Sequence, residues 1–401
     1  MKNAEPRNPI RMEDFLRPQM FQKWTRLVHF DWKRDGDNRL VNSSSIAFWI
    51  SAILNLLFFG LNGWDIIRHL SSGGRPSNQN PPVISITIYF SIRGLMLFVK
   101  RREIIDFVNA LDRECPLETQ KQLEMRLERT YKSFWQRYRF LRVYVHSTGP
   151  IFCCLPLAVY LLTNQGFGAP ITQHNQLLGG WMPFNLRRNP RFYPLVWLFD
   201  VSCTTCGVSF FLTFDNLFNV MQGHLIMHLD HLCRHLEAIN PADSVTNEVE
   251  FFADLRTLVQ RQQLLNRLCG QYNDIFKVAF LVSNFLGAGS LCFYLFMLSE
   301  TTDLFMIIQY ITPTMVLVAF TFEICLRGTQ LEEASARIES SLSQQAWYMG
   351  SQRYRKFFFL WMQYSQRTQK LGAFGLMEVN MVHFTDIMQL AYRLFTFLKS
   401  H

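Results

Sequence analysis

At 401 residues the chain is long enough for two or three soluble domains, but no part of it is spaced like soluble domains. Hydrophobic residues make up 49% of the chain and phenylalanine occurs 37 times, while a mean hydropathy near zero hides an alternation of uncharged and highly charged stretches. Protease, hydrolase and nucleotide-binding motifs do not occur, which argues against an enzyme and against a bound cofactor.

Seven apolar stretches have the length of membrane-spanning helices, because a bilayer core of roughly 30 Å needs about 20 helical residues. Four of them carry no charged residue: 43–64, 143–163, 278–298 and 304–322. Three more are interrupted by a few charges: Arg93 in 83–99, Asp200 and Asp215 in 193–217, and Glu378, Asp386 and Arg393 in 375–398. The pattern predicts an all-α membrane protein with seven transmembrane helices.

The basic residues predict how the helices are oriented. The N-terminal segment and every second connection hold 31 Lys and Arg residues, whereas the alternate connections hold 5. The positive-inside rule therefore places the N-terminus in the cytoplasm and, after seven helices, the C-terminus outside. The net charge of +9 is an orientation signal and gives no reason to expect nucleic acid. We find no signal peptide, and no cysteine falls in an expected outside loop, so we expect no extracellular disulfide framework.

The expected cytoplasmic connections are amphipathic and helical. Either each of these helices simply packs on its neighbour, or several transmembrane helices continue into the cytosol and form a shared anchor bundle. Apolar residues recur every three or four positions in three runs: Leu123, Leu127, Tyr131, Phe134, Tyr138; Leu225, Leu229, Leu232, Leu236, Ile239; and Leu331, Ala334, Ile338, Leu342. Beside the second run, four histidines follow one helix face: His224, His228, His231 and His235. A polar flank, a pH-dependent interface and a metal site are all compatible with this spacing, although no acidic residue completes a ligand set on that face.

Charged residues at membrane depth are rare and usually have a function. Arg93 could pair with Asp200 if the second and fourth helices pack together. Asp386 and Arg393 lie seven residues apart in the last helix, hence on nearly the same face. A closed bundle could pair them, but we expect that this face borders a water-filled path.

The C-terminal sequence WYMGSQRYRKFFFLWMQYSQRTQKLGAFGL, followed by QLAYRLFTFLKS, resembles the insect odorant receptor family. The matching features are a basic turn at Arg353, Arg355 and Lys356, then QxxQKL and the glycines Gly372 and Gly375. The related gustatory receptors carry Thr-Tyr and Gln-Phe in their last helix, where this chain has Ala391-Tyr392 and Phe397-Leu398.

The resemblance implies a subunit of a ligand-gated, non-selective cation channel in the plasma membrane of olfactory sensory neurons. It also implies a heterotetramer with the family's shared co-receptor, and the compact segment 222–274 looks like that of an odorant-tuning subunit. The implied organisation is a cytoplasmic segment 1–42, six helices with the odorant pocket in 43–325, anchor helices in 326–374 and a pore-lining seventh helix in 375–401.

By the same resemblance, the odorant pocket lies in the outer half of helices two to six and binds small apolar volatile molecules. The positions that we nominate for it are Ile86, Tyr89, Phe90, Leu157, Tyr160, Trp197, Asp200, Met306, Gln309 and Tyr310. For the pore we nominate Leu390, Leu394 and Phe397, with Phe397 as a hydrophobic gate. Arg393 would repel a permeant cation, so it either turns away from the axis or makes this subunit contribute unequally.

The main alternative is a seven-helix G-protein-coupled chemoreceptor, which requires an outside N-terminus and usually an extracellular disulfide. A transporter is a third possibility, but no inverted repeat or pair of broken helices is evident. The sequence indicates neither the odorant nor the subunit stoichiometry, nor whether the chain gates without a partner.

Overall fold

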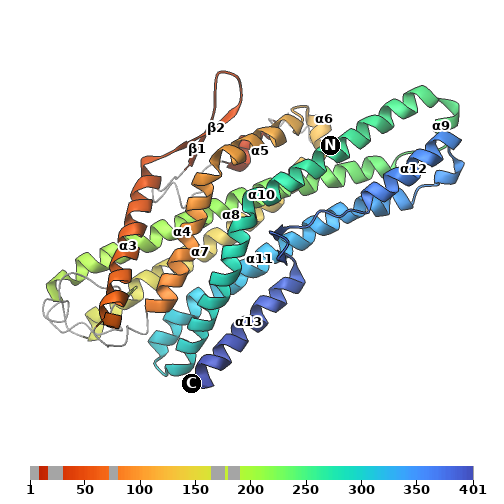
Figure 1. Cartoon of the computed structure of the whole chain (residues 1–401). Coiled ribbons are helices and arrows are strands. Elements are labelled where there is room, and N and C mark those ends of the chain that lie inside the picture. The colour runs from red at the N-terminus through yellow and green to blue at the C-terminus, as the bar shows by residue number, and fades with distance from the viewer. Residues whose placement is uncertain (1–8, 17–29, 72–79, 164–176, 179–189, 401) are drawn as a thin grey trace, which may run out of the picture.

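Helices form most of the chain in the computed structural model, which describes residues 9–16, 30–71, 80–163, 177–178 and 190–400 (Figure 1). The helices are α1 (Met12–Leu16), α3 (Ile46–Ser71), α4 (Asn80–Val99), α5 (Arg101–Glu114), α6 (Thr119–Glu124), α7 (Leu127–Thr163), α8 (Tyr193–Glu237), α9 (Asp243–Thr246), α10 (Glu248–Glu300), α11 (Leu304–Ser343), α12 (Gln352–Ser365) and α13 (Met381–Ser400). Two short antiparallel hairpins join them: β1 (Phe30–Arg34) with β2 (Leu40–Ser44), and β3 (Gly372–Ala373) with β4 (Met377–Glu378).

Each of the seven apolar stretches predicted from the sequence is mostly helical, in α3, α4, α7, α8, α10, α11 and α13. Two of them begin before their helix: residues 43–44 belong to β2, and residues 375–380 include β4 and precede α13. Within the described residues, four helices are long and apolar enough to cross a membrane: Ile46–Trp64 in α3, α8, α10, and Met306–Ser343 in α11. Shorter apolar segments, Ile84–Val99 and Ile151–Leu162, lie in α4 and α7. The all-α membrane fold predicted from the sequence is therefore confirmed.

The longest helices extend well beyond a bilayer. At about 1.5 Å per residue, the 45 residues of α8 and the 53 of α10 measure about 68 and about 80 Å, more than twice the apolar core of a membrane. Figure 1 shows α8, α10, α11 and α12 running together toward α9 at one end of the molecule, and adjacent pairs of them are in contact. The apolar runs predicted from the sequence form the core of this extension, where Leu225, Leu229 and Leu331 are buried.

One expected helix is broken in two. The sequence predicts a continuous amphipathic helix from Leu123 to Tyr138, but α6 ends at Glu124 and α7 begins at Leu127. Arg126 between them has a φ of 56°, a left-handed conformation that does not occur inside an α-helix. Leu123 is consequently exposed while Leu127 is buried.

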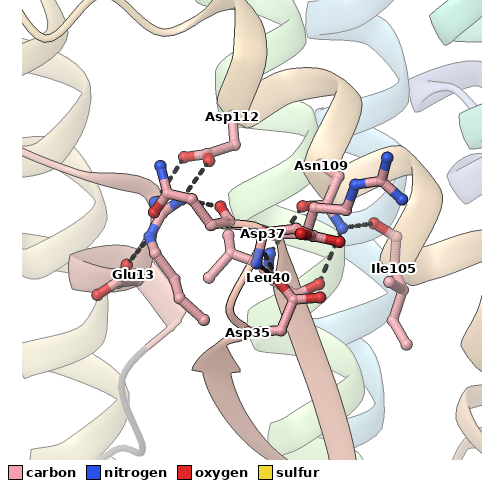
Figure 2. Close-up of polar contacts among 10 residues, drawn as sticks. Glu13, Asp35, Asp37, Leu40, Ile105, Asn109 and Asp112 are labelled. Atoms are coloured by element: carbon pink, nitrogen blue, oxygen red, sulfur yellow. Dashed lines mark hydrogen bonds and ion pairs between the residues drawn. The ribbon is translucent and has the colours of Figure 1, made fainter.

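The β1–β2 hairpin, which the sequence analysis did not predict, is attached to α5 by side chains. Arg34 donates to both carboxylate oxygens of Asp112, at 2.9 and 3.1 Å, and also pairs with Glu13 of α1. The Asn109 side chain pairs with the backbone N–H and C=O of Leu40, both at 2.8 Å, as Figure 2 shows. The β1–β2 hairpin and α1 are thereby held against α5.

A cluster of three ionised side chains lies where the apolar parts of α7, α8 and α11 end. Arg137 of α7 donates to Asp215 at 2.6 Å and forms a two-pronged contact with Glu323 of α11. Asp215, one of the charges noted within the fourth apolar stretch, is buried, and Arg137 compensates its charge. We take this cluster as the boundary between the membrane-spanning and extended parts of the bundle.

Candidate ligand-binding site

A cavity of about 150 Å³ lies within the membrane-spanning part of the bundle. Helices α3, α4, α7, α8, α10 and α11 line it, together with one residue of the segment between α7 and α8. The lining residues are mostly apolar or small: Asn55, Ile86, Thr87, Phe90, Gly149, Phe152, Cys153, Leu178, Cys203, Thr204, Gly207, Val208, Tyr294, Thr312, Pro313 and Val316. Such a space suits a small, largely apolar molecule.

Few polar groups face this cavity, and most of them are already engaged. Thr204 and Thr312 donate their hydroxyl protons to backbone carbonyls four residues earlier, at 2.9 Å each, which leaves only lone pairs for a ligand. Tyr294 differs, because its hydroxyl makes no hydrogen bond within the described residues while its ring packs near Tyr310. Tyr294 is therefore one donor that the cavity offers to an oxygen acceptor on a ligand.

The pocket residues nominated from the sequence fall into four groups. Ile86 and Phe90 line the cavity. Tyr89, Met306 and Tyr310 are buried in the apolar cluster beside it, to which Ile86 and Phe90 also belong.

Two nominated polar residues act on the segment that covers the cavity. Asp200 accepts a hydrogen bond from the Leu178 backbone N–H at 3.3 Å, and Gln309 donates to the Leu177 carbonyl at 3.2 Å. They hold Leu178 over the cavity from α8 and α11. Most of the segment between α7 and α8 lies outside the described residues.

The remaining three, Leu157, Tyr160 and Trp197, pack in a separate cluster around Tyr193. The Tyr160 and Tyr193 ring centroids lie 4.6 Å apart. Trp197 reaches the cavity wall only through its indole N–H, which donates to the Cys153 carbonyl at 2.9 Å.

The expectation that Arg93 pairs with Asp200 is wrong. The Arg93 guanidinium is fully buried, and it donates to the Tyr89 hydroxyl and to Ser283 of α10. Its central carbon lies 4.3, 4.7 and 4.9 Å from the ring centroids of Tyr89, Phe211 and Phe214. Aromatic faces thus replace the carboxylate that the sequence suggested, because Asp200 is turned toward Leu178.

The contacts of Arg93 continue toward the last helix. Ser283 is followed on α10 by Asn284, whose side-chain oxygen lies 3.1 Å from Nε2 of His383 on α13. Residues from Tyr89 to His383 surround a second, much smaller space of about 30 Å³. A chain of contacts therefore connects Phe90 in the cavity wall, through the neighbouring Tyr89, to the start of α13.

Helix α13 packs on α10 and α11 through Ile387 and Ala391, both buried. The nominated pore residues Leu390, Leu394 and Phe397 lie on its exposed surface, with Phe397 60% exposed. Asp386 and Arg393 are exposed as well.

Comparison with known proteins agrees with this architecture. Residues 75–392 match the family model described as 7tm Odorant receptor. Odorant receptor 88a of Drosophila melanogaster is 68% identical over the full length of both chains. This chain belongs to the insect odorant receptor family. It is therefore an odorant-binding membrane receptor and not an enzyme.

Solved structures resemble the fold of this odorant receptor. The olfactory receptor OR5 from Machilis hrabei superposes with a TM-score of 0.69 over 88% of each chain at 14% identity. The same receptor in complex with eugenol gives a TM-score of 0.71 over 88% of this chain and 89% of that one, at 15% identity. Odorant receptor 85c of Drosophila melanogaster is 25% identical over 89% of this chain.

Several cavity residues of the odorant receptor were not nominated from the sequence, among them Asn55, Tyr294 and the Thr204–Gly207 pair. The rotation of each helix about its own axis decides which residues face inward, and uniformly apolar helices carry little signal about that rotation. The small residues Thr204 and Gly207 on one face of α8 were the available sign, since small side chains leave space between helices.

Proposed function

We propose that this receptor is the odorant-tuning subunit of a ligand-gated, non-selective cation channel, which assembles with a co-receptor into a tetramer in the plasma membrane of olfactory sensory neurons. The N-terminus lies in the cytoplasm and the C-terminus outside, in line with the 31 to 5 distribution of basic residues. The cytoplasmic extension of α8, α10, α11 and α12 anchors the subunits to one another.

The observation that carries this proposal is the apolar cavity with Tyr294 as its free donor. A ligand that fits is a small volatile molecule with at least one oxygen acceptor, such as an ester, an ether or a methoxyphenol. The related Machilis receptor was solved with eugenol, which belongs to this chemical class. Asp200 and Gln309 hold the cover of the cavity, and the other nominated residues shape the walls behind it.

The face of α13 that carries Leu390 and Phe397 lines the ion path in this proposal. With about 100° per residue, Asp386 and Arg393 lie within about 40° of Phe397 around the helix axis. One flank of α13 therefore combines two charges with the nominated gate, as expected for a surface wetted by a channel. Ligand binding favours the open position of α13 through the contacts from Tyr89 and Arg93 to His383.

Current recording from cells that express the receptor with the co-receptor tests this proposal. We expect odorant-evoked cation current that persists when G-protein signalling is blocked. Loss of the current under that block would instead support a G-protein-coupled receptor.

A substitution that fills the cavity tests the binding site itself. Thr204→Trp adds seven heavy atoms to a 150 Å³ space, so we expect at least a tenfold loss of odorant sensitivity at normal surface expression. Leu198→Trp is the matched control, because Leu198 is on the same helix and 60% exposed. Equal responses of the two variants would place the ligand elsewhere.

A further inference from the structure

A second and larger cavity lies in the extended part of the bundle, outside the odorant site. It has a volume of about 780 Å³ and lies between α7, α8 and α11, with Phe15 of α1 at its edge. The ion cluster of Arg137, Asp215 and Glu323 borders its membrane side. The cavity therefore begins at the depth of lipid headgroups and continues away from the membrane.

Every basic residue that lines this cavity is an arginine: Arg126, Arg129, Arg137, Arg234, Arg327 and Arg337. Three acidic residues, Asp230, Glu237 and Glu333, also line it. The planar guanidinium group binds phosphate and carboxylate groups with two parallel hydrogen bonds, which lysine cannot do. The uniform choice of arginine indicates recognition of a planar or multivalent anion.

The arginines are compensated unevenly. Arg337 pairs with Asp230 at 2.6 Å and lies 3.8 Å from Glu237, and Arg137 belongs to the ion cluster. Arg126, Arg129 and Arg327 have no carboxylate within ion-pair distance in the described part of the chain, and Arg327 donates only to Gln330, at 3.2 Å. Three guanidinium groups around one space thus lack an anionic partner.

Buried polar atoms at the same cavity also lack partners. Arg234 donates through Nη1 to the Glu124 carbonyl, but its Nε and Nη2 atoms are buried without a hydrogen bond, with Nε 3.4 Å from Asp230. Nε2 of His224 and the side-chain oxygen of Asn219 are likewise buried and unsatisfied. Buried groups of this kind cost free energy, so these side chains of the cavity wall would gain from a polar partner.

We propose that this cavity binds a phosphorylated inositol, supplied either by a phosphoinositide headgroup in the cytoplasmic leaflet or by a soluble inositol phosphate. The unpaired arginines meet the phosphate groups, while Ser133, Thr130 and Glu333 offer partners for the ring hydroxyls. Basic pockets between helices at the cytoplasmic face suit such headgroups. The membrane source depends on the orientation proposed above, whereas binding of the soluble form does not.

Binding measurements on the purified full-length receptor test the proposal. One arm titrates soluble inositol trisphosphate, and the other uses nanodiscs with and without phosphatidylinositol bisphosphate, with phosphatidylserine discs as the charge control. Binding in both arms, or in one, supports the site and identifies its source. Absence of binding in both, or equal binding to phosphatidylserine, overturns it.

Paired variants locate the site. Arg126→Gln with Arg129→Gln removes two exposed, unpaired cations, so the fold is retained and we expect affinity to fall by about tenfold or more. Arg256→Gln with Arg267→Gln changes the net charge equally at exposed positions of α10 outside the cavity and should change affinity by less than about twofold. Equal losses in the two pairs would show diffuse attraction and overturn the proposal. Arg327→Lys, which keeps the charge but loses the fork, should also weaken binding. None of these readouts depends on odorant-evoked current, so they stand or fail separately from the channel function.

Discussion

For Arg93, the sequence predicts an unusual charge at membrane depth but not the side chains that surround it. The sequence correctly marks it as an unusual charge at membrane depth, and a carboxylate on a neighbouring helix is the simplest partner. The structure surrounds it with aromatic rings and two hydroxyl groups, from Tyr89 and Ser283. Phe211 and Phe214 of α8 carry no charge, so a search of the sequence for oppositely charged partners could not identify them as neighbours of Arg93.

Replacing Arg93 by methionine tests whether the charge serves stability or coupling. Methionine fills a similar volume and removes a buried charge that has no carboxylate at ion-pair distance, so we expect the thermal stability to be unchanged or higher by about 1–2 kcal/mol. We expect odorant-evoked current to fall, because the hydrogen bonds from α4 to α10 are lost. Thermal melting and current recording at matched surface expression measure the two effects. A Met variant that is strongly destabilised would assign Arg93 to folding alone.

The nominated cavity residues show the same limit. Ile86 and Phe90 line the cavity, whereas Tyr89 between them faces Phe211 and Arg93. A helix turns by about 100° per residue, so neighbours in sequence point to different surfaces. Residue type alone could not separate them.

At the scale of elements, periodicity predicted the helical cytoplasmic runs and placed Leu225, Leu229 and Leu232 correctly in the core. It failed at the boundary of α6 and α7, where Arg126 adopts a positive φ without a Gly or Pro to mark the break. The β1–β2 hairpin was also missed, although the sequence Asp-Gly-Asp-Asn at 35–38 is a turn signal between its strands.

The histidine file on α8 is an element whose chemistry depends on burial. Burial lowers the pKa of His224 to about 4 and of His228 to about 3, and it lowers that of the half-buried His231 to about 4. His228 accepts from Arg261 of α10 at Nδ1, at 3.0 Å, and Arg261 in turn pairs with Glu114 of α5. These rings stay neutral between pH 6 and 8, which argues against a pH-dependent interface in that range.

The lowered pKa values predict acid sensitivity instead. In the unfolded chain these histidines take up protons near pH 6.5, whereas in the folded chain they do so only near pH 3 to 4. Stability is therefore constant above about pH 6.5 and falls as the pH drops toward 4, by up to about 1.4 kcal/mol per pH unit for each buried histidine. Melting temperatures between pH 8 and 4 measure this, and His228→Gln should flatten the slope. An exposed control, His235→Gln, should leave the slope as it is, and identical slopes for both variants would contradict the assignment.

At the scale of the whole molecule, segment length, charge bias and the C-terminal sequence were enough to predict the membrane fold and the family. The unequal lengths of the helices were not predictable in the same way, because an amphipathic run can continue a membrane helix or form a separate one. How chains assemble cannot be read from one chain, and the role of the exposed surface of α13 depends on the chains that would pack around it.

The gate proposed on α13 can be tested in the assembled channel. Phe397→Ala removes an exposed ring from the flank that carries Asp386 and Arg393, so we expect a higher resting current in the absence of odorant. Tyr392→Ala is the control, because Tyr392 is 62% exposed but lies about 140° away around the helix. Leak current in whole-cell recordings compares them. Similar leak in both variants and the unmodified receptor would remove Phe397 from the gate.

The β3–β4 hairpin sets α13 apart from α8, α10 and α11, each of which enters the extended bundle as one continuous helix. Its turn uses two left-handed residues, Phe374 and Gly375, and its strand end lies so close to α11 that any side chain at Gly328 would collide with the Val379 carbonyl. Helices α8, α10 and α11 thus continue without a break into the extended bundle, whereas α13 is joined to it through this tightly packed hairpin. In the proposed channel, a tilt of α13 then requires rotation about a few bonds near Asn380 rather than bending of a helix, so that the proposed subunit contacts stay in place while the proposed ion path widens.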